Sequence, residues 1–193
     1  MKIVLCSASP RRKELLRRIV SEFTVRTAQT DENIQEADCE RRVQALALRK
    51  ARAVVMQAGE VLLGADTLVC LGTEILGKPC DRVDAARMLR LLSGQVHQVY
   101  TGVALRSAER EAVFCERTDV QFAPISEEEL QRYLDEAAFL DKAGAYAIQE
   151  EGARFVTRIE GCPSNVVGLP VSQVHRALRS MACWQALGFD ESD

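Results

Sequence analysis

The chain has 193 residues, of which 47% are hydrophobic and 27% are charged, as in an ordinary globular protein with one sizeable core. Its formal net charge of −3 gives no general attraction for nucleic acid or for an anionic membrane, so any anion site must be local. No apolar run approaches the roughly 20 residues that span a bilayer. The seven scattered cysteines form no Cys-x-x-Cys pair, so we expect reduced thiols, a cytoplasmic location and no zinc site.

Hydrophobic periodicity predicts a mixed α/β chain. The expected strands are 2–6, 23–28, 61–65, 68–71, 96–105, 112–122, 145–149 and 155–159, and the expected helices are 10–19, 39–59, 82–92, 127–137 and 171–183. Strands and helices alternate first and strands cluster later. This order favours one mixed central sheet flanked by helices, as two lobes around a cleft, over separate domains. We therefore expect residues 1–193 to form a single domain, with a frayed tail after about residue 184.

The stretch S-A-S-P-R-R follows the first strand and opens the first helix. Ser9 is a preferred N-cap and Pro10 suits the first helical position. Arg11 and Arg12 then lie in the first turn, where the helix dipole penalises each cation by about 0.3–1 kcal/mol. A phosphate ligand, held also by the Ser7 hydroxyl, would make this placement favourable. The alternative is that both arginines simply extend into water, as most surface arginines do.

Asp66 ends an apolar strand, where active-site groups gather in open α/β sheets. Gly64 and Ala65 leave the approach to it uncrowded, and Lys78 follows downstream beside Pro79. A carboxylate next to phosphate-binding cations is what a Mg²⁺ ion bridging a nucleotide requires. The alternative is an aspartate that only caps a turn through its own backbone.

Further polar residues are weaker candidates. Glu32 is a candidate second carboxylate or a solvated loop acid, and Lys50 is a phosphate ligand or surface charge on a basic helix face. His97 lies in an expected strand away from any nucleophile, which favours a structural role. Cys6 fits core packing better than catalysis.

Six sequence blocks occur in order over residues 7–170. They are S-A-S-P-R-R, G-A-D-T-L-V, I-L-G-K-P, L-S-G-Q-V-H-Q-V-Y-T-G-V, D-K-A-G-A-Y-A-I-Q and N-V-V-G-L-P. Each block alone is a weak signal, but six at compatible spacing are specific. With them the chain resembles the Maf family of nucleoside triphosphate pyrophosphatases.

The resemblance implies a mixed α/β fold with two lobes around a cleft, related to the inosine triphosphate pyrophosphatase architecture, and a homodimer. It also implies hydrolysis of a nucleoside triphosphate between the α and β phosphates, with a divalent metal, Mg²⁺ or Mn²⁺, as cofactor. The products are the monophosphate and pyrophosphate, and the cellular role is removal of unwanted nucleotides.

By position, Asp66 matches the family's catalytic acidic residue, which accepts a proton, binds the metal or does both. The resemblance assigns the phosphate-binding role to Ser7, Arg12, Lys50 and Lys78, and a place near the metal to Glu32. The positions that separate the family's branches are Arg11, Thr67 and Gln149. The side chains found there are those of the branch that uses dTTP and UTP, with modified pyrimidine nucleotides as further candidates.

One departure from the family pattern concerns the base pocket. Gln149 is followed by Glu150, Glu151 and Gly152, where a glycine often comes sooner, so an acidic pair borders the pocket. Two alternative functions stay open. The first is a nucleotide-binding regulator of septum formation and cell division, and the second is a 7-methyl-GTP pyrophosphatase.

Overall fold

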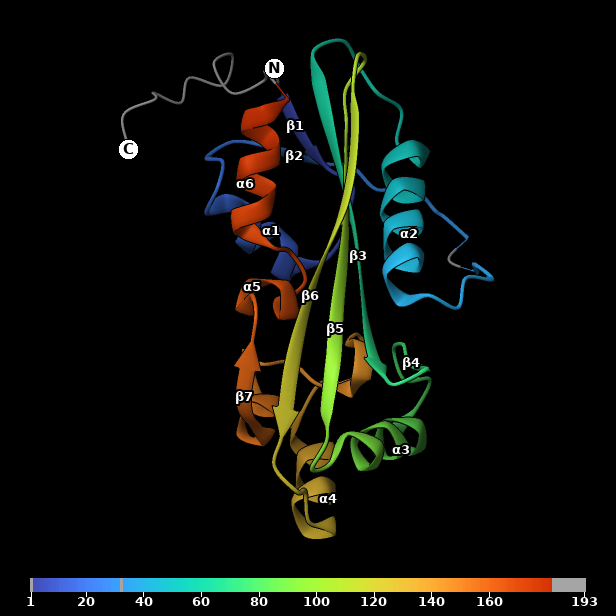
Figure 1. The fold of residues 1–193 in the computed structure, drawn as a ribbon, viewed down its shortest axis with the longest axis vertical. Coiled ribbons are helices and arrows are strands. Elements are labelled where there is room, and N and C mark those ends of the chain that lie inside the picture. Colours follow the sequence, from blue (N-terminus) through green and yellow to red (C-terminus); the bar gives the residue numbers. More distant parts are fainter. Residues whose placement is uncertain (1, 32, 182–193) are drawn as a thin grey trace. The chain divides into compact units, whose positions relative to one another are not determined.

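The computed structural model describes residues 2–31 and 33–181 (Figure 1). Its helices are α1 (Pro10–Arg17), α2 (Cys39–Ala53), α3 (Arg82–Leu92), α4 (Glu127–Glu136), α5 (Pro163–Val167) and α6 (Val171–Ser180), with 3₁₀ helices η1 (Ala143–Ala145) and η2 (Glu151–Phe155). Its strands are β1 (Lys2–Leu5), β2 (Thr24–Val25), β3 (Glu60–Leu71), β4 (Glu74–Leu76), β5 (Val96–Arg106), β6 (Glu111–Phe122) and β7 (Val156–Glu160).

The strands of the described residues form a seven-stranded sheet in the order β2-β1-β3-β5-β6-β7, with β4 paired to β3. β1 runs parallel to β2 and to β3, whereas β4 is antiparallel to β3 and β7 is antiparallel to β6. The predicted mixed sheet with helices is therefore confirmed.

The chain divides into two compact units. Unit 1 comprises residues 1–66, 101–116 and 168–193, and unit 2 comprises residues 67–100 and 117–167. The division falls between Asp66 and Thr67 within β3, so these neighbouring site candidates belong to different units.

Several predicted elements differ from the observed ones. The strands expected at 61–65 and 68–71 are one continuous strand, β3. The helix expected to reach residue 59 ends at Ala53, because Val54 adopts an extended backbone conformation (φ −86°, ψ 129°). The short elements β4 and α5 were not expected, and the end of the last expected helix, like the expected frayed tail, lies outside the described residues.

The strand expected at 145–149 is wrong. Its place is taken by η1 and a turn, because Gly144 and Ala145 have φ angles of 69° and 65°. Positive φ angles in two successive residues are incompatible with the extended backbone of a strand. The apolar pattern of these residues reflects burial among other elements rather than pairing in the sheet.

In unit 1 the backbone of α2 lies directly on the sheet. A Cβ added at Gly64 of β3 would come within 2.2 Å of the Ala47 carbonyl oxygen, and one added at Gly102 of β5 within 2.3 Å of the Val43 carbonyl oxygen. Ala47 and Ala51 of α2 form a buried cluster with Ala104 of β5. Small residues on both sides thus allow helix and sheet to meet backbone to backbone.

An ion pair ties β3 to the segment after β2, also in unit 1. The Arg26 guanidinium contacts the Glu60 carboxylate, whose side chain is only 8% exposed. The same carboxylate accepts a hydrogen bond from the Gln57 backbone N–H at 2.8 Å. Both contacts lower the pKa of Glu60, and the hydrogen bond from Arg26 has the larger effect.

The core of unit 2 is rich in aromatic side chains. Phe122 of β6 makes edge contacts with His97 of β5 and with Tyr146, at ring centroid distances of 4.8 and 4.7 Å. Tyr133 of α4 packs on Phe155 at 5.1 Å. The same core contains the inward faces of α3 and α4, so the residues around η1 are held from several sides.

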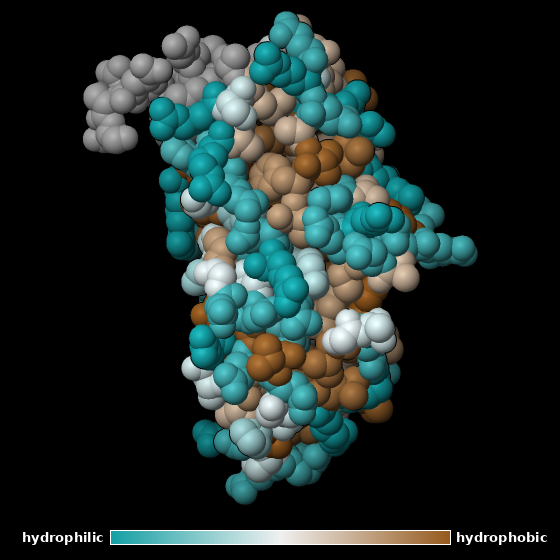
Figure 2. Space-filling model, in the orientation of Figure 1, coloured by the Kyte–Doolittle hydropathy of each residue, from teal (hydrophilic) through white to brown (hydrophobic). Residues whose placement is uncertain are grey.

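The visible surface is mainly hydrophilic, with small separate hydrophobic patches (Figure 2). Large apolar side chains that are exposed are single residues, such as Val55 and Val83. Among the described helices, none combines the length and apolar character needed to cross a membrane.

The state of the cysteines is only partly as expected. Cys6, Cys80, Cys115 and Cys162 are free thiols. Cys39 and Cys70 are disulfide-bonded, so the expectation of reduced thiols is wrong for these two. Sequence spacing gave no signal for this difference, because a disulfide depends on spatial proximity.

We predict that Gly64→Ala destabilises the fold by about 1–3 kcal/mol, because the new methyl group meets the α2 backbone and cannot be accommodated by a side-chain rotation. Gly77→Ala is the matched control, since a Cβ at Gly77 has no atom within 4 Å, and it should stay within about 0.5 kcal/mol of wild type. Urea unfolding measures both. Equal free energies of unfolding for the two variants would contradict the close approach.

A second prediction concerns pH. Because the pKa of Glu60 in the folded state is below its ordinary value of 4.5, its stabilising effect is present above that pH and is lost as the pH falls through the folded-state pKa. The difference in the free energy of unfolding between wild type and Glu60→Gln should therefore be constant from pH 7 to 5 and shrink below about pH 4.5. A difference that stays the same down to pH 3 in urea titrations would disprove this linkage.

Candidate functional site

Two of the predicted site residues lie on or next to the paired strands β1 and β3. The strands are paired in parallel, with Leu5 opposite Leu63, and the Cys6 N–H donates to the Leu63 carbonyl at 2.8 Å. Ser7 follows the end of β1, whereas Asp66 lies within β3, which continues to Leu71, so the expectation that Asp66 ends a strand is wrong. Both residues are polar and buried, 8% and 7% exposed. They lie within three residues of the Leu5–Leu63 pair, on neighbouring strands of unit 1.

The amino end of α1 is built as predicted. The Ser9 side chain accepts a hydrogen bond from the Arg12 N–H, and Pro10 is at the start of the helix. The Arg12 guanidinium does not simply extend into water: Nη1 donates to Ser7 Oγ at 3.1 Å and Nε to the Gly168 carbonyl at 2.9 Å. Arg11, in the same turn, is half-buried. Arg12 is thus directed to the end of β1, where Ser7 lies.

Lys50 and Asp66 form an ion pair at 2.6 Å between Nζ and Oδ1, with side chains 16% and 10% exposed. Gly64 and Asp66 lie two residues apart on β3, so their side-chain positions share a face of the strand. That face is the one on which α2 packs at Gly64. The close approach of α2 therefore sets the distance across which Lys50 reaches Asp66.

The residues around Asp66 fit a metal ion that arrives with its substrate. The described residues contain no group of three or more His, Cys, Asp or Glu side chains placed to hold a metal. Glu32, the predicted second carboxylate, lies outside the described residues. Mg²⁺ commonly binds through one or two carboxylates together with substrate phosphates and keeps several waters. Asp66 supplies one such carboxylate, and its role as a metal ligand stays a prediction.

Lys78 belongs to unit 2, in the loop after β4. It is exposed, and its ammonium makes no hydrogen bond or ion pair with the part of the chain that the structure describes. The residue before it, Gly77, accepts a hydrogen bond from the Gly144 N–H at 3.0 Å. Pro79, which follows, is buried. The loop is thereby fixed on both sides of a cation that points into solvent.

Thr67 and Gln149 are also in unit 2. Thr67 lies on the same face of β3 as Val69, two residues on. Gly144 packs on that face, since a Cβ added to it would be 3.1 Å from the Val69 side chain. Gln149 is exposed in the turn that follows, and its amide makes no hydrogen bond within the described residues. The placement of Lys78, Thr67 and Gln149 toward Asp66 stays a prediction.

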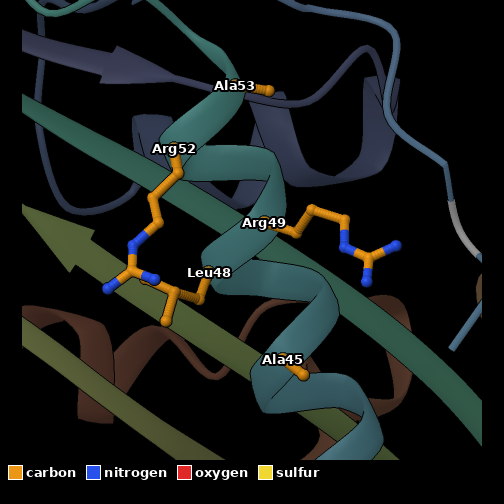
Figure 3. A pocket seen from close by; sticks show the side chains of 5 residues that line it. All are labelled: Ala45, Leu48, Arg49, Arg52 and Ala53. Carbon is orange, nitrogen blue, oxygen red and sulfur yellow. The ribbon is translucent and has the colours of Figure 1, made fainter. Parts of the chain in front are cut away.

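A hollow of about 510 Å³ lies along the outer face of α2 and is lined by Ala45, Leu48, Arg49, Arg52 and Ala53. Figure 3 shows the Arg49 and Arg52 side chains pointing away from one another. Arg49 donates to the Asp31 carbonyl at 2.5 Å, and Arg52 pairs with Glu111 at 2.9 Å. Both cations are engaged, and Lys50 lies on another face of α2, so this hollow is separate from the phosphate-binding candidates.

The two rejected candidates have core environments. His97 is fully buried, and its Nε2 shares a 2.6 Å hydrogen bond with the Tyr146 hydroxyl. Burial lowers the pKa of His97 to about 4, so the ring is neutral at physiological pH. Burial raises the pKa of the Cys6 thiol to about 11, which keeps it protonated. Neither residue has the environment of a general base or a nucleophile.

Sequence reasoning missed one group at the site, the Gly168 carbonyl that accepts from Arg12. Its signal was present in the block N-V-V-G-L-P, but a backbone acceptor 156 residues away from its donor has no local pattern. It also missed the contact between Gly144 and Gly77, which ties the Gln149 segment to the Lys78 loop.

Comparisons with known proteins find similar chains over nearly the whole length of this one. The Maf-like protein family matches residues 2–181. A dTTP/UTP pyrophosphatase of Bacillus velezensis is 45% identical over 180 residues, which cover 92% of this chain and 95% of that protein. A dTTP/UTP pyrophosphatase of Symbiobacterium thermophilum is 47% identical over 182 residues, with 93% and 92% covered.

Two solved structures share the fold. The Ham1 protein of Staphylococcus aureus matches with a TM-score of 0.54 at 12% identity, covering 94% of this chain and 100% of that one. A HAM1 protein from Coxiella burnetii matches with a TM-score of 0.52 at 14% identity, covering 93% and 99%. At such identities the likeness shows the fold alone. The family match and the relatives that are nearly half identical over almost the full length show that the chain belongs to the Maf family.

Proposed function

We propose that the protein is a nucleoside triphosphate pyrophosphatase that hydrolyses dTTP and UTP to the monophosphate and pyrophosphate. Relatives covering more than nine tenths of the chain carry the name dTTP/UTP pyrophosphatase. Within the structure the proposal rests mainly on one observation, the buried Lys50–Asp66 pair in unit 1, the unit that also contains the Ser7–Arg12 contact.

Four residues of the chain bind the triphosphate and neutralise its charge. Ser7 and Arg12 bind phosphate oxygens at the amino end of α1, where the helix dipole also favours an anion. Lys50 and Lys78 neutralise further charge on the triphosphate. The Lys50 ammonium has three donors, so it can bond to Asp66 and to a phosphate oxygen at once.

Asp66 accepts the proton of the attacking water at a carboxylate oxygen, while Lys50 holds the carboxylate in place. The water attacks the α-phosphorus in line, the bond to the bridging oxygen breaks, and pyrophosphate leaves with that oxygen. Asp66, with Glu32, would hold the divalent cation, which supplies charge neutralisation and a more acidic bound water. Mg²⁺ and Mn²⁺ both fit an oxygen donor set.

Three residues select the base, of which Gln149 and Thr67 belong to unit 2 and Arg11 to unit 1. The Gln149 amide has a donor and an acceptor, which match the edge of uracil or thymine. Arg11 and Thr67 complete the set that distinguishes pyrimidine nucleotides from 7-methyl-GTP. Modified pyrimidine nucleotides belong to the same substrate class.

The remaining parts of the proposal concern the whole protein. Residues 1–193 act as a single Maf-like domain. The enzyme works as a homodimer in the cytoplasm, where it removes unwanted nucleotides. A regulator of cell division that only binds nucleotides would need the cations but not Asp66, so retention of the paired carboxylate favours the enzyme.

The test is pyrophosphate release from dTTP and UTP, with Mg²⁺ and with a chelator in its place. Wild type should turn over only with the metal. Asp66→Asn keeps an acceptor for Lys50 but loses the base, so the rate should fall about 10²–10⁴-fold with little change in nucleotide binding. Asp135→Asn, an exposed carboxylate paired with Arg82, is the control that should keep full activity. Asp66→Asn with more than a tenth of the wild-type rate would rule out its assigned role.

Specificity gives a second prediction. Arg11→Trp combined with Thr67→Gln should lower kcat/KM for dTTP and UTP by about 10-fold or more relative to that for 7-methyl-GTP, because it replaces contacts to the base. Phosphate binding should change less, since Ser7, Arg12 and Lys50 are untouched. Release rates compared across the three nucleotides measure this ratio. An unchanged ratio would count against the pyrimidine assignment.

A further inference from the structure

Lys142 is a buried lysine that the proposed mechanism does not use. Its side chain is 4% exposed, yet it lies directly before η1 in unit 2. Its ammonium contacts the Ala138 carbonyl, the Asp141 carboxylate at 2.8 Å and the Glu150 carboxylate at 3.1 Å. The first two contacts are hydrogen bonds, and the third is an ion pair.

The chain that follows Lys142, in and after η1, is anchored by hydrogen bonds to buried residues. Tyr133 is only 1% exposed, and its hydroxyl donates to the Ala145 carbonyl at 2.9 Å. Tyr146 is held by its 2.6 Å hydrogen bond to His97. Ala145 keeps a φ of 65°, which costs a residue with a side chain about 1–2 kcal/mol. Backbone strain of this kind persists only where the surroundings fix the conformation.

The turn that follows is short and closed on itself. A Cβ added to Gly152 would lie 2.8 Å from the carbonyl oxygen of Ala147 and 3.0 Å from its nitrogen. The Glu150 N–H donates to the Ala147 carbonyl at 3.3 Å. Gln149 lies between these contact points, exposed, with its amide unbonded within the described residues. Glu150, the next residue, is the one that reaches Lys142.

We propose that Lys142 and Glu150 are positioning residues for base selection: their ion pair joins the anchored η1 segment to the 147–152 turn and holds the Gln149 amide in the orientation that reads the nucleobase. The inference rests on the proposed function. It also accounts for one of the two acids beside the predicted base pocket, because the charge of Glu150 is directed to Lys142.

Glu150 and its neighbour Glu151 provide a matched pair of variants. Both are exposed acids beside Gln149, but the Glu151 side chain makes no ion pair within the described residues. Glu150→Ala removes the link, Glu150→Gln keeps an acceptor for Lys142, and Glu151→Ala removes one negative charge without touching the link. Lys142→Met would leave no ammonium to bury and is the second route to the same loss.

With wild type as reference, Glu150→Ala should raise KM for dTTP and UTP about 3–10-fold with kcat within twofold. It should lower the preference for these nucleotides over GTP and speed amide hydrogen exchange over residues 147–153. Glu150→Gln should recover part of the preference, and Glu151→Ala should match wild type. The melting temperature is recorded for every variant.

Three results would overturn the proposal. The first is an equal preference of Glu150→Ala and Glu151→Ala for dTTP and UTP over GTP. The second is a loss of activity by the same factor on all nucleotides that follows the fall in melting temperature. The third is an unchanged rate of amide hydrogen exchange over residues 147–153 in Glu150→Ala. The Gln149→Ala variant distinguishes a failure of the positioning role from a failure of the proposed function. Failure of wild type to release pyrophosphate refutes the proposed function, whereas a Gln149 effect that Glu150→Ala does not reproduce refutes only the positioning role.

Discussion

The candidate site of unit 1 depends on the contact between the backbones of α2 and β3. Because Gly64 has no Cβ, the helix comes close enough for Lys50 to pair with Asp66, which lies on the same face of the strand. A larger residue at position 64 would move the helix outward and with it the ammonium group. The geometry of the Lys50–Asp66 ion pair is therefore a consequence of packing between small residues, which include Ala47 and Ala51 of α2.

In unit 2 an irregular segment, η1 and the turn after it, is held in one conformation by specific contacts. Helix or sheet pairing would satisfy its backbone automatically, but η1 and the next turn depend on specific partners: Tyr133, Gly77 and the Lys142–Glu150 pair. Most of these partners are buried or part of the protein backbone, so solvent cannot replace them easily. The exposed Lys78 and Gln149 side chains thus extend from loops that are fixed at their bases.

Much of this could be predicted from the sequence, and what could not has a physical reason. Strand and helix periodicity found the sheet and the exact bounds of α3, and the Ser9–Pro10 signal found the start of α1. Local chemistry also pointed to Asp66 and Arg12. The failure at 145–149 arose because buried apolar residues look alike in a strand and in an anchored turn, and the φ of Ala145 is imposed by tertiary contacts. The Lys142–Glu150 pair and the Gly168 acceptor join residues whose proximity only the folded chain creates.

The arginines at the start of α1 lie where the helix dipole disfavours positive charge. Ser7 Oγ and the Gly168 carbonyl are neutral acceptors, so these contacts orient the Arg12 guanidinium without cancelling its charge. The helix dipole adds positive potential at the same place. A helix end with this arrangement favours a multiply charged anion over a neutral ligand, because only the anion converts both unfavourable terms into attraction. The geometry at this helix end is therefore consistent with the phosphate-binding role predicted for Ser7 and Arg12 from the pattern S-A-S-P-R-R.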